Sequence, residues 1–322
     1  MWKRNARPKI AAILLGEQTQ HLLRELFPDR SGEAGLFDGF APVERRIVLW
    51  GDAPAPLDLP HRGVVAPEDE LLRRLWLRVP ALDNLDPQQP EPACWRIQSS
   101  PDYKPEGLGP GDSDMDAQYH FGSREARVAQ VELKDGSEAS ACWVESLAAG
   151  WLFLLACGEG LASLIAVGDS VERLLAGSRL IAPRVLRTLC QSAPVPAYPR
   201  MRRILANDQT IFCGTAAMSF DPLCGEGAGN AVRGAFLAAA LVRAARAGAG
   251  RDELANHYRA RLTQGFLRHL QLCLQFYSTG GFGAMWRSES DALRRGIELL
   301  SRDLKDLPPP RFALVDRELI AL

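Results

Sequence analysis

The sequence predicts an α/β fold in which an antiparallel β-sheet is followed by a helical C-terminal region. Residues 126–169 alternate apolar and polar side chains, as in RVAQVEL, and are divided by turns, which indicates about four half-buried strands. Residues 252–277 and 284–304 repeat apolar side chains at helical spacing. Residues 213–235 run from a strand through a glycine-rich loop into an alanine-rich helix.

The other elements follow from local patterns. Helices are predicted over 9–27, which ends at Pro28, and over 66–80, whose first turn is acidic. Asp135-Gly136 predicts a turn within the sheet, after its first strand. Residues 80–116 are rich in Pro and Gly and predict a long loop with at most one short strand, near residues 93–97. The remaining expectations are strands over 45–52 and 210–217 and helices over 170–178 and 182–191.

Composition and charge exclude several classes of protein. A chain of 322 residues with 47% hydrophobic content can bury a large core, and its net charge of −1 gives no reason to expect a nucleic-acid partner. Its seven cysteines are odd in number and form no C-x-x-C pair, which favours a reducing compartment. No apolar run approaches the roughly 20 residues of a membrane span. We therefore expect a cytoplasmic protein with no membrane partner.

The glycine-rich segment CGTAAMSFDPLCGEGAGNAVRGA (213–235) carries the strongest functional signal. A loop of glycines that opens a helix aims free backbone N–H groups and a positive dipole end at one point. Gly225, Gly227 and Gly229 place no side chain in the way, and Asp221-Pro222 stiffens the turn. The alternative is an ordinary strand–helix connection whose glycines serve packing only. The residues alone leave both open.

This segment resembles the C-terminal flavin motif of the FAD-dependent monooxygenase superfamily, which has the p-hydroxybenzoate-hydroxylase-like fold. The superfamily includes tryptophan halogenases and flavoproteins that mature tryptophan-derived quinone cofactors. Residues 9–26 and 150–160 resemble two further segments of such proteins. The resemblance implies a cofactor-binding set at the loop, composed of Gly214, Thr215, Asp221, Pro222, Cys224, Gly225, Glu226, Gly227 and Ala228. Within it, Gly214 and Thr215 would lie near the ribityl chain or pyrophosphate of FAD.

The implied fold is an FAD-binding oxidoreductase fold, incomplete at the N-terminus because no G-x-G-x-x-G turn occurs before residue 16. We expect a partial FAD-binding domain formed by residues 1–80 and 195–250. Residues 81–194 would form an inserted substrate domain with the antiparallel sheet, and residues 251–322 the helical C-terminal region.

The implied function is that of an FAD-dependent oxidoreductase of the monooxygenase type. Its substrate would be an aromatic small molecule or a protein-bound tryptophan, and NAD(P)H or a reduced flavin would supply electrons. Halogenation is less expected, because Cys224-Gly225 stands where halogenases carry a Glu-Ser pair and residues 38–50 lack their lysine. The alternative is a truncated or degenerate flavoprotein that acts as a binding module, since Thr215 replaces the motif's usual Asp.

Several side chains are candidates for chemistry. Glu17 and Glu226 are the carboxylates most expected to act as acid or base, and solvated or capping roles are equally open to them. Cys224 precedes a helix N-terminus, a position that lowers a thiol pKa, and a buried packing role is its alternative. His269 and Cys273 share a helix face, but two ligands do not define a metal site, so no metal is predicted.

Two further segments carry weaker signals. Trp151 and Phe153 lie on a predicted strand and would line an aromatic-substrate pocket or, as the default, pack in the core. FGSR, at residues 121–124, faintly resembles the Gly-Arg pair that crosses from the middle of such FAD domains.

Overall fold

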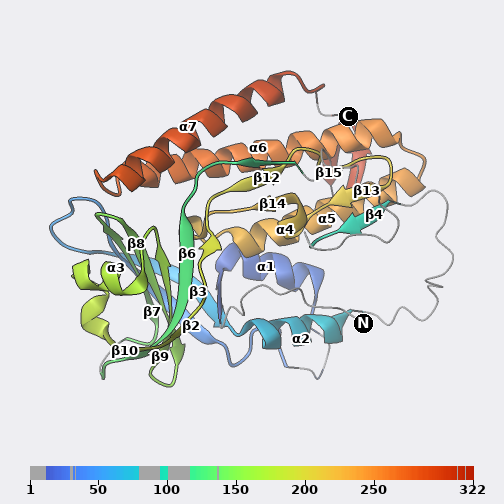
Figure 1. The fold of residues 1–322 in the computed structure, drawn as a ribbon. Coiled ribbons are helices and arrows are strands. Elements are labelled where there is room, and N and C mark those ends of the chain that lie inside the picture. Colours follow the sequence, from blue (N-terminus) through green and yellow to red (C-terminus); the bar gives the residue numbers. More distant parts are fainter. Residues whose placement is uncertain are drawn as a thin grey trace.

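The computed structural model describes residues 12–29, 32, 34–79, 95–100, 117–135, 138–309, 311–315 and 317–322. Its long helices cross the upper part of Figure 1, and its largest sheet lies at the lower left. The helices are α1 (Glu17–Leu26), α2 (Glu68–Arg78), α3 (Val171–Gly177), α4 (Gly214–Ala217), α5 (Gly227–Arg246), α6 (Arg251–Tyr277) and α7 (Ala284–Lys305), with short 3₁₀ turns η1 (Ala182–Arg184) and η2 (Pro222–Cys224).

The largest sheet has nine strands in the order β1-β3-β2-β7-β8-β9-β6-β10, and β11 also pairs with β6. They are β1 (Ile13–Gly16), β2 (Ala41–Leu49), β3 (Leu57–Ala66), β6 (Glu125–Leu133), β7 (Ala141–Leu147), β8 (Gly150–Gly158), β9 (Leu161–Val167), β10 (Val185–Gln191) and β11 (Val195–Pro196). Short ladders join β4 (Arg96–Gln98) to β13 (Thr210–Phe212), and β12 (Arg200–Arg202) to both β5 (Gln118–His120) and β14 (Met218–Ser219).

Both faces of the large sheet are covered, because successive side chains of a strand point to opposite faces. On one face Leu152 and Leu154 of β8 pack with Leu174 of α3. On the other face Trp151 belongs to the core formed with α6 and α7, and its indole nitrogen donates to the Tyr277 hydroxyl at 3.0 Å. Trp151 is therefore a core residue, the default role expected for it.

Most of the predicted elements are confirmed, and the sheet order is the main correction. The strands β7, β8 and β9 pair in sequence order, but β6 pairs with β9 and β10 rather than with β7. Instead β7 lies parallel to β2, with Arg45 opposite Ala141. The strand β7 is buried over residues 141–145 and has partners on both edges, so β2 takes the place beside it that β6 would have in a simple hairpin. Asp135 lies in a turn after β6, and Gly136 of the predicted turn lies outside the described residues.

Two local predictions are wrong. Residues 185–191 form the edge strand β10 rather than a helix, because pairing with β6 overrides the local pattern. Residues 13–16 form β1, paired with β3, so the helix predicted over 9–27 begins only at Glu17. The predicted helical C-terminal region is confirmed by α6 and α7, and a hairpin of β15 (Phe312–Val315) and β16 (Glu318–Ala321) follows them.

Parts of two other predictions remain open. The long loop predicted over 80–116 lies outside the described residues at 80–94 and 101–116, while its short strand is present as β4. Strands from residues 1–80 and 81–194 share the large sheet, and the division of the chain into domains stays a prediction. In the described ranges, no helix has the length and apolar character needed to cross a bilayer.

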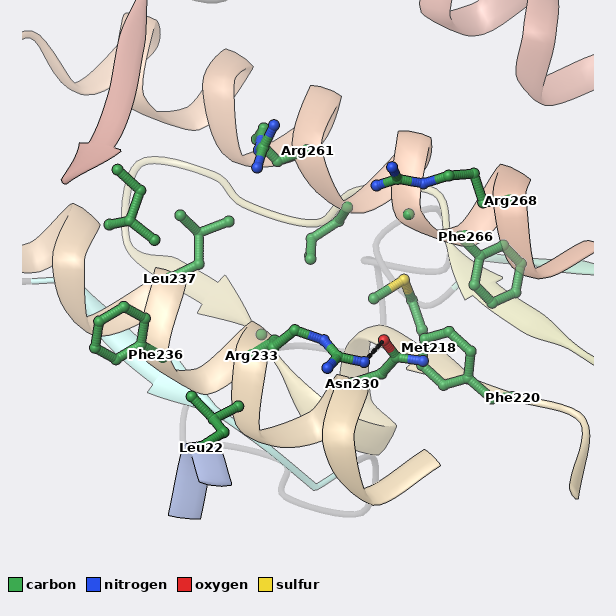
Figure 2. Close-up of a pocket in the computed structure, with 14 residues that line it drawn as sticks. Leu22, Met218, Phe220, Asn230, Arg233, Phe236, Leu237, Arg261, Phe266 and Arg268 are labelled. Carbon is green, nitrogen blue, oxygen red and sulfur yellow. Dashed lines mark hydrogen bonds between the residues drawn. The ribbon is translucent and has the colours of Figure 1, made fainter. Parts of the chain in front are cut away.

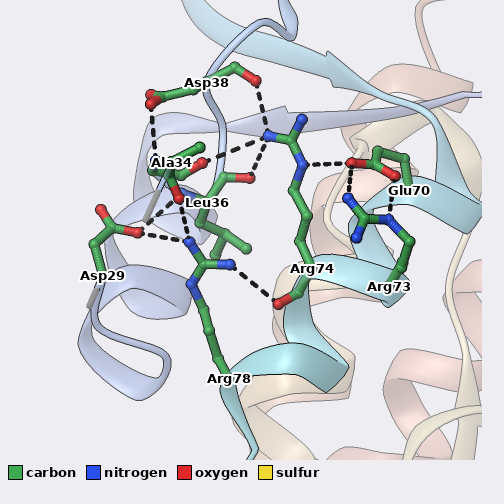
Figure 3. A network of polar contacts seen from close by, with 9 residues as sticks. Asp29, Ala34, Leu36, Asp38, Glu70, Arg73, Arg74 and Arg78 are labelled. Carbon is green, nitrogen blue, oxygen red and sulfur yellow. Dashed lines mark hydrogen bonds and ion pairs between the residues drawn. The ribbon is translucent and has the colours of Figure 1, made fainter. Parts of the chain in front are cut away.

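Arginines of α2 fix the turn that leads into β2 (Figure 3). Arg78 donates to the Ala34 carbonyl at 2.7 Å. Arg74 donates to the carbonyls of Leu36 at 3.2 Å and Asp38 at 2.7 Å. These hydrogen bonds satisfy carbonyl groups of a loop that lies outside the β-sheet, and so they fix the path by which the chain enters β2.

The tight approach of two turns beside β8 gives a test of this fold. Gly168 has φ +104°, and a Cβ there would lie 2.4 Å from the Ala149 carbonyl oxygen. We expect Gly168→Ala to lower the free energy of unfolding by about 2–4 kcal/mol, from backbone strain and overpacking. Gly160→Ala is the control, because Gly160 has φ +71° but nothing within 4 Å of its Cβ position. Urea unfolding of both variants measures the difference, and equal losses would contradict the packing described.

Candidate functional site

The glycine-rich segment forms a series of short elements that lead into α5. Its predicted strand is confirmed only over Thr210–Phe212, after which α4 and β14 lead to η2. Gly225 closes η2 in the left-handed conformation, at φ 66°, where glycine is favoured. Gly225, Glu226 and Gly227 are exposed, so the loop presents its backbone to solvent.

The N-terminus of α5 is open. Its N-cap residue Glu226 makes no side-chain hydrogen bond to the helix, and a Cβ on Gly227 would meet nothing within 4 Å. The first backbone N–H groups of α5 are therefore left for a ligand or water, with the positive end of the helix dipole behind them.

A second uncapped helix lies against the first turn of α5. The N-cap of α1, Gly16, also makes no side-chain cap bond. A Cβ on Gly229 of α5 would lie 2.7 Å from the Thr19 hydroxyl of α1, so the two first turns touch. Glu17 begins α1, and its carboxylate pairs with Arg62 at 3.3 Å in an exposed position. The structure thus brings the helix that carries Glu17 beside the glycine-rich loop.

A buried ion cluster holds the loop in place. The Asp221 carboxylate accepts hydrogen bonds from Arg124 Nε at 2.8 Å, from the Tyr277 hydroxyl at 3.0 Å and from the Leu223 backbone N–H at 2.8 Å. Arg124 also pairs with Glu289 of α7, so two buried carboxylates share one guanidinium. Burial alone would lower the pKa of Arg124, but the charges of Asp221 and Glu289 raise it.

The sequence predicts that Asp221 contacts a cofactor. In the structure, its carboxylate bonds to protein groups and so fixes the position of the loop. Its carboxylate is buried and engaged by protein donors, and it caps η2 through Leu223. Burial, followed by the nearby Asp221 charge, raises the pKa of Tyr277 well above its usual range. The Tyr277 hydroxyl therefore keeps its proton at pH 7 and donates it to Asp221.

Arg46 of β2 stands beside the loop. Its Nη2 lies 3.8 Å from the Cβ position of Gly225, and its Nε is buried without a hydrogen-bond partner among the described residues. The Nε2 of His61 on β3 is also buried and unpartnered. Burial, and then the charge of Arg46, lower the pKa of His61, so this imidazole is neutral at pH 7. Arg46 Nε and His61 Nε2 are thus buried atoms without a hydrogen-bond partner among the described residues, and Arg46, which also bonds to the Cys142 thiol, reaches Gly225 through Nη2.

Three ligand-type side chains meet beneath the loop. The Sγ atoms of Cys224 and Cys273 are 3.6 Å apart, and Nε2 of His269 is 3.4 Å from the Cys273 sulfur. All three ligand atoms lie within 4.8 Å of one another. The sequence predicts only that His269 and Cys273 share a helix face. The structure adds Cys224, which lies 49 residues before Cys273 in the chain.

The cavity of Figure 2 is lined by other residues, two of which, Phe220 and Phe266, pack against the His269 ring. It measures about 230 Å³ and lies between α5 and α6. Arg233, Arg261, Arg268 and Asn230 are the polar residues of a lining that is otherwise apolar, and Arg233 donates to the Asn230 side chain at 3.0 Å. None of the residues predicted to bind a cofactor is part of this lining.

The fold is shared with flavin-dependent enzymes. No family model matches the chain, and no curated protein is similar enough in sequence to match it. Among solved structures, the chain is similar to the flavin-dependent halogenase CmlS, with a TM-score of 0.68 and 18% identity over 91% of this chain. It spans 64% of the length of that chain.

Two further solved structures that are similar to this chain are named for different activities. The peptidyl tryptophan dihydroxylase QhpG matches with a TM-score of 0.61 and 17% identity, over 98% of this chain and 79% of its own. The tetracycline destructase Tet(51) matches with a TM-score of 0.53 and 10% identity, over 95% of this chain and 90% of its own. The chain therefore has an FAD-dependent monooxygenase-like fold, as the resemblance of the glycine-rich segment predicts.

The ion cluster gives the first prediction for the site. Replacing Arg124 by Met leaves Asp221 and Glu289 buried without a counter-charge, so we expect a loss of about 3–5 kcal/mol in the free energy of unfolding. Arg187→Met is the control, because Arg187 forms an exposed pair with Glu132 that should contribute less than about 1 kcal/mol. Chemical denaturation measures the free energy of unfolding of both variants. A loss for Arg124→Met no larger than for the control would refute the role of the cluster.

The reactivity of Cys224 gives a second prediction for the site. A hydrogen bond from Cys273 outweighs burial and lowers the pKa of Cys224 to about 6. A lowered thiol pKa means that the reactive thiolate is present above that pH and lost below it. We therefore expect alkylation of Cys224 by iodoacetamide to rise with a midpoint near pH 6, read by mass spectrometry. In Cys273→Ala the midpoint should move upward, and an unchanged midpoint would show that Cys273 is not the cause.

Proposed function

We propose that the chain is a flavoprotein oxidoreductase whose glycine-rich loop, Pro222–Gly227, holds the isoalloxazine and ribityl portion of FAD. The observation that carries the proposal is the guanidinium of Arg46, whose Nη2 lies 3.8 Å from the Cβ position of Gly225, beside an exposed glycine loop at an uncapped helix N-terminus. Carbonyl oxygens and ring nitrogens of a flavin are acceptors suited to these donors.

The residues present fit the flat end of a flavin. Gly225 and Gly227 leave the loop backbone open, so a ring can approach its N–H groups. The Thr215 hydroxyl is exposed and donates to the Ser99 carbonyl at 3.3 Å, which keeps it near the turn where a ribityl hydroxyl would lie in this proposal. Cys224 belongs to this loop, and Ala228 directly follows it. The 322 residues contain no G-x-G-x-x-G turn, so binding would depend on these contacts.

The reaction proposed is a monooxygenase-type oxidation of an aromatic small molecule or a protein-bound tryptophan. A bound flavin would supply the redox chemistry with O₂, using electrons from NAD(P)H or a reduced flavin. The chain would orient the ring and exclude water from one side of it. Glu17 and Glu226 are the proposed proton carriers, since both lie at the helix N-termini beside the loop.

Two other functions are weaker. Halogenation is disfavoured because Cys224-Gly225 replaces the Glu-Ser pair of halogenases. A binding module without catalysis is the alternative of a different class. It would share the fold and ion cluster but would show no affinity for a flavin.

Flavin titration tests the proposal. We expect the purified protein to quench the fluorescence of riboflavin and FAD with similar dissociation constants, because the proposed contacts are to the isoalloxazine and ribityl portion. Arg46→Met should weaken both about tenfold, as the loss of a charged hydrogen bond predicts. Arg45→Met is the matched control, since the neighbouring Arg45 pairs with Glu138 and Asp58 instead. Absence of binding to either flavin would favour the binding module.

A further inference from the structure

We propose that Cys224 and Cys273 form a reversible dithiol–disulfide pair, oxidised by hydrogen peroxide, that joins the glycine-rich loop to α6. The two Sγ atoms are 3.6 Å apart and come from η2 and α6. A disulfide requires about 2.0 Å between sulfurs, so the two side chains need to close roughly 1.6 Å. The six cysteines in the described part of the chain are free, so this is the reduced state of the pair.

The two sulfurs are unequal, as a nucleophile and a resolving thiol are. Cys273 is fully buried, and burial raises its pKa well above the usual range, which keeps it a thiol. It can donate to Cys224, which is half-buried and whose pKa is lowered to about 6 by that hydrogen bond. The more accessible sulfur is therefore the thiolate at pH 7, and its neighbour holds the proton.

The reaction balances with peroxide as the two-electron oxidant. The Cys224 thiolate attacks one oxygen of H₂O₂, the O–O bond breaks, and hydroxide leaves as Cys224 becomes a sulfenic acid. The Cys273 sulfur then attacks the Cys224 sulfur, the S–O bond breaks, and the hydroxyl group leaves as water with the proton of Cys273. Each sulfur is oxidised by one electron, and the two oxygens of peroxide are reduced to the level of water.

A metal site is the competing use of the same cluster. Cys224, Cys273 and His269 are suitable zinc ligands by type. However, Nε2 of His269 already accepts the Asp221 backbone N–H at 3.0 Å, and its Nδ1 is buried with no partner among the described residues. A metal-bound histidine normally donates its other N–H to an acceptor. The imidazole is thus arranged to hold the loop backbone, which favours thiol chemistry over metal binding.

The consequence for the fold is a covalent link at the loop. Cys224 immediately precedes Gly225, and Asp221 ties the same turn to the ion cluster. Oxidation would therefore fix a second point of the loop to the helical layer. The pair does not depend on flavin binding, so it stands or fails separately from the proposed function.

Peroxide oxidation of the full-length protein tests the pair. We expect one equivalent of H₂O₂ to remove two titratable thiols, and dithiothreitol to restore both. Non-reducing peptide mapping should show a link from Cys224 to Cys273. Cys213→Ser is the matched control, because Cys213 lies in the same tryptic peptide and its loss should leave the link intact.

Two variants make the outcome decisive. In Cys273→Ser, oxidation should stop at a Cys224 sulfenic acid that dimedone traps, and in Cys224→Ser the loss of thiol at Cys273 should slow at least tenfold, by order of magnitude. The proposal is overturned if wild-type protein gives the trapped sulfenic acid without a link. It is equally overturned if the protein as isolated holds stoichiometric Zn²⁺ that Cys224→Ser releases.

Discussion

The paired charges of Arg124, Asp221 and Glu289 are the interaction on which the rest of this structure depends. They bring together the residue before β6, the turn before α5 and the first half of α7, and Tyr277 adds the end of α6. Removing one partner of a buried ion pair is costly, and both carboxylates are paired with the same guanidinium, so the segments that carry the three groups cannot move independently. Ser123 completes the arrangement, because its backbone N–H and hydroxyl both donate to Glu289 at 3.0 Å.

This constraint explains how an exposed glycine loop can hold one shape. Asp221 is fixed on both sides, by Arg124 through its carboxylate and by His269 through its backbone N–H. The three residues that follow form η2, and the left-handed Gly225 then turns the chain into α5. Loops are usually the mobile parts of a fold, but this one is attached to the core at its first residue. The open backbone beyond it is therefore preorganised, as a binding site for a flat ligand needs.

Much of this fold could be predicted from the sequence, because the signals are local. The glycine-rich segment, α5, α6 and α7 follow from turn chemistry and helical spacing. The edge strand β10 could not, since its partner β6 lies more than fifty residues earlier and pairing decided its structure. Arg46 had a readable signal: in a strand, two successive arginines point to opposite faces, so Arg45 and Arg46 cannot share one environment. The meeting of Cys224 with Cys273 had none, because only tertiary packing brings them together.

Hydrogen exchange at the loop tests the central claim most directly, namely that the ion cluster holds Pro222–Val232 ready for a flavin. Exchange of the peptide covering these residues can be measured by mass spectrometry in the wild type and in Glu289→Gln, with and without FAD. The account predicts that FAD slows exchange at the start of α5, whose first N–H groups have no cap. It also predicts faster exchange in Glu289→Gln at Leu223, because Arg124 loses one counter-charge there and the Leu223 N–H donates to Asp221. Identical exchange in both proteins, with no effect of FAD at this peptide, would contradict it.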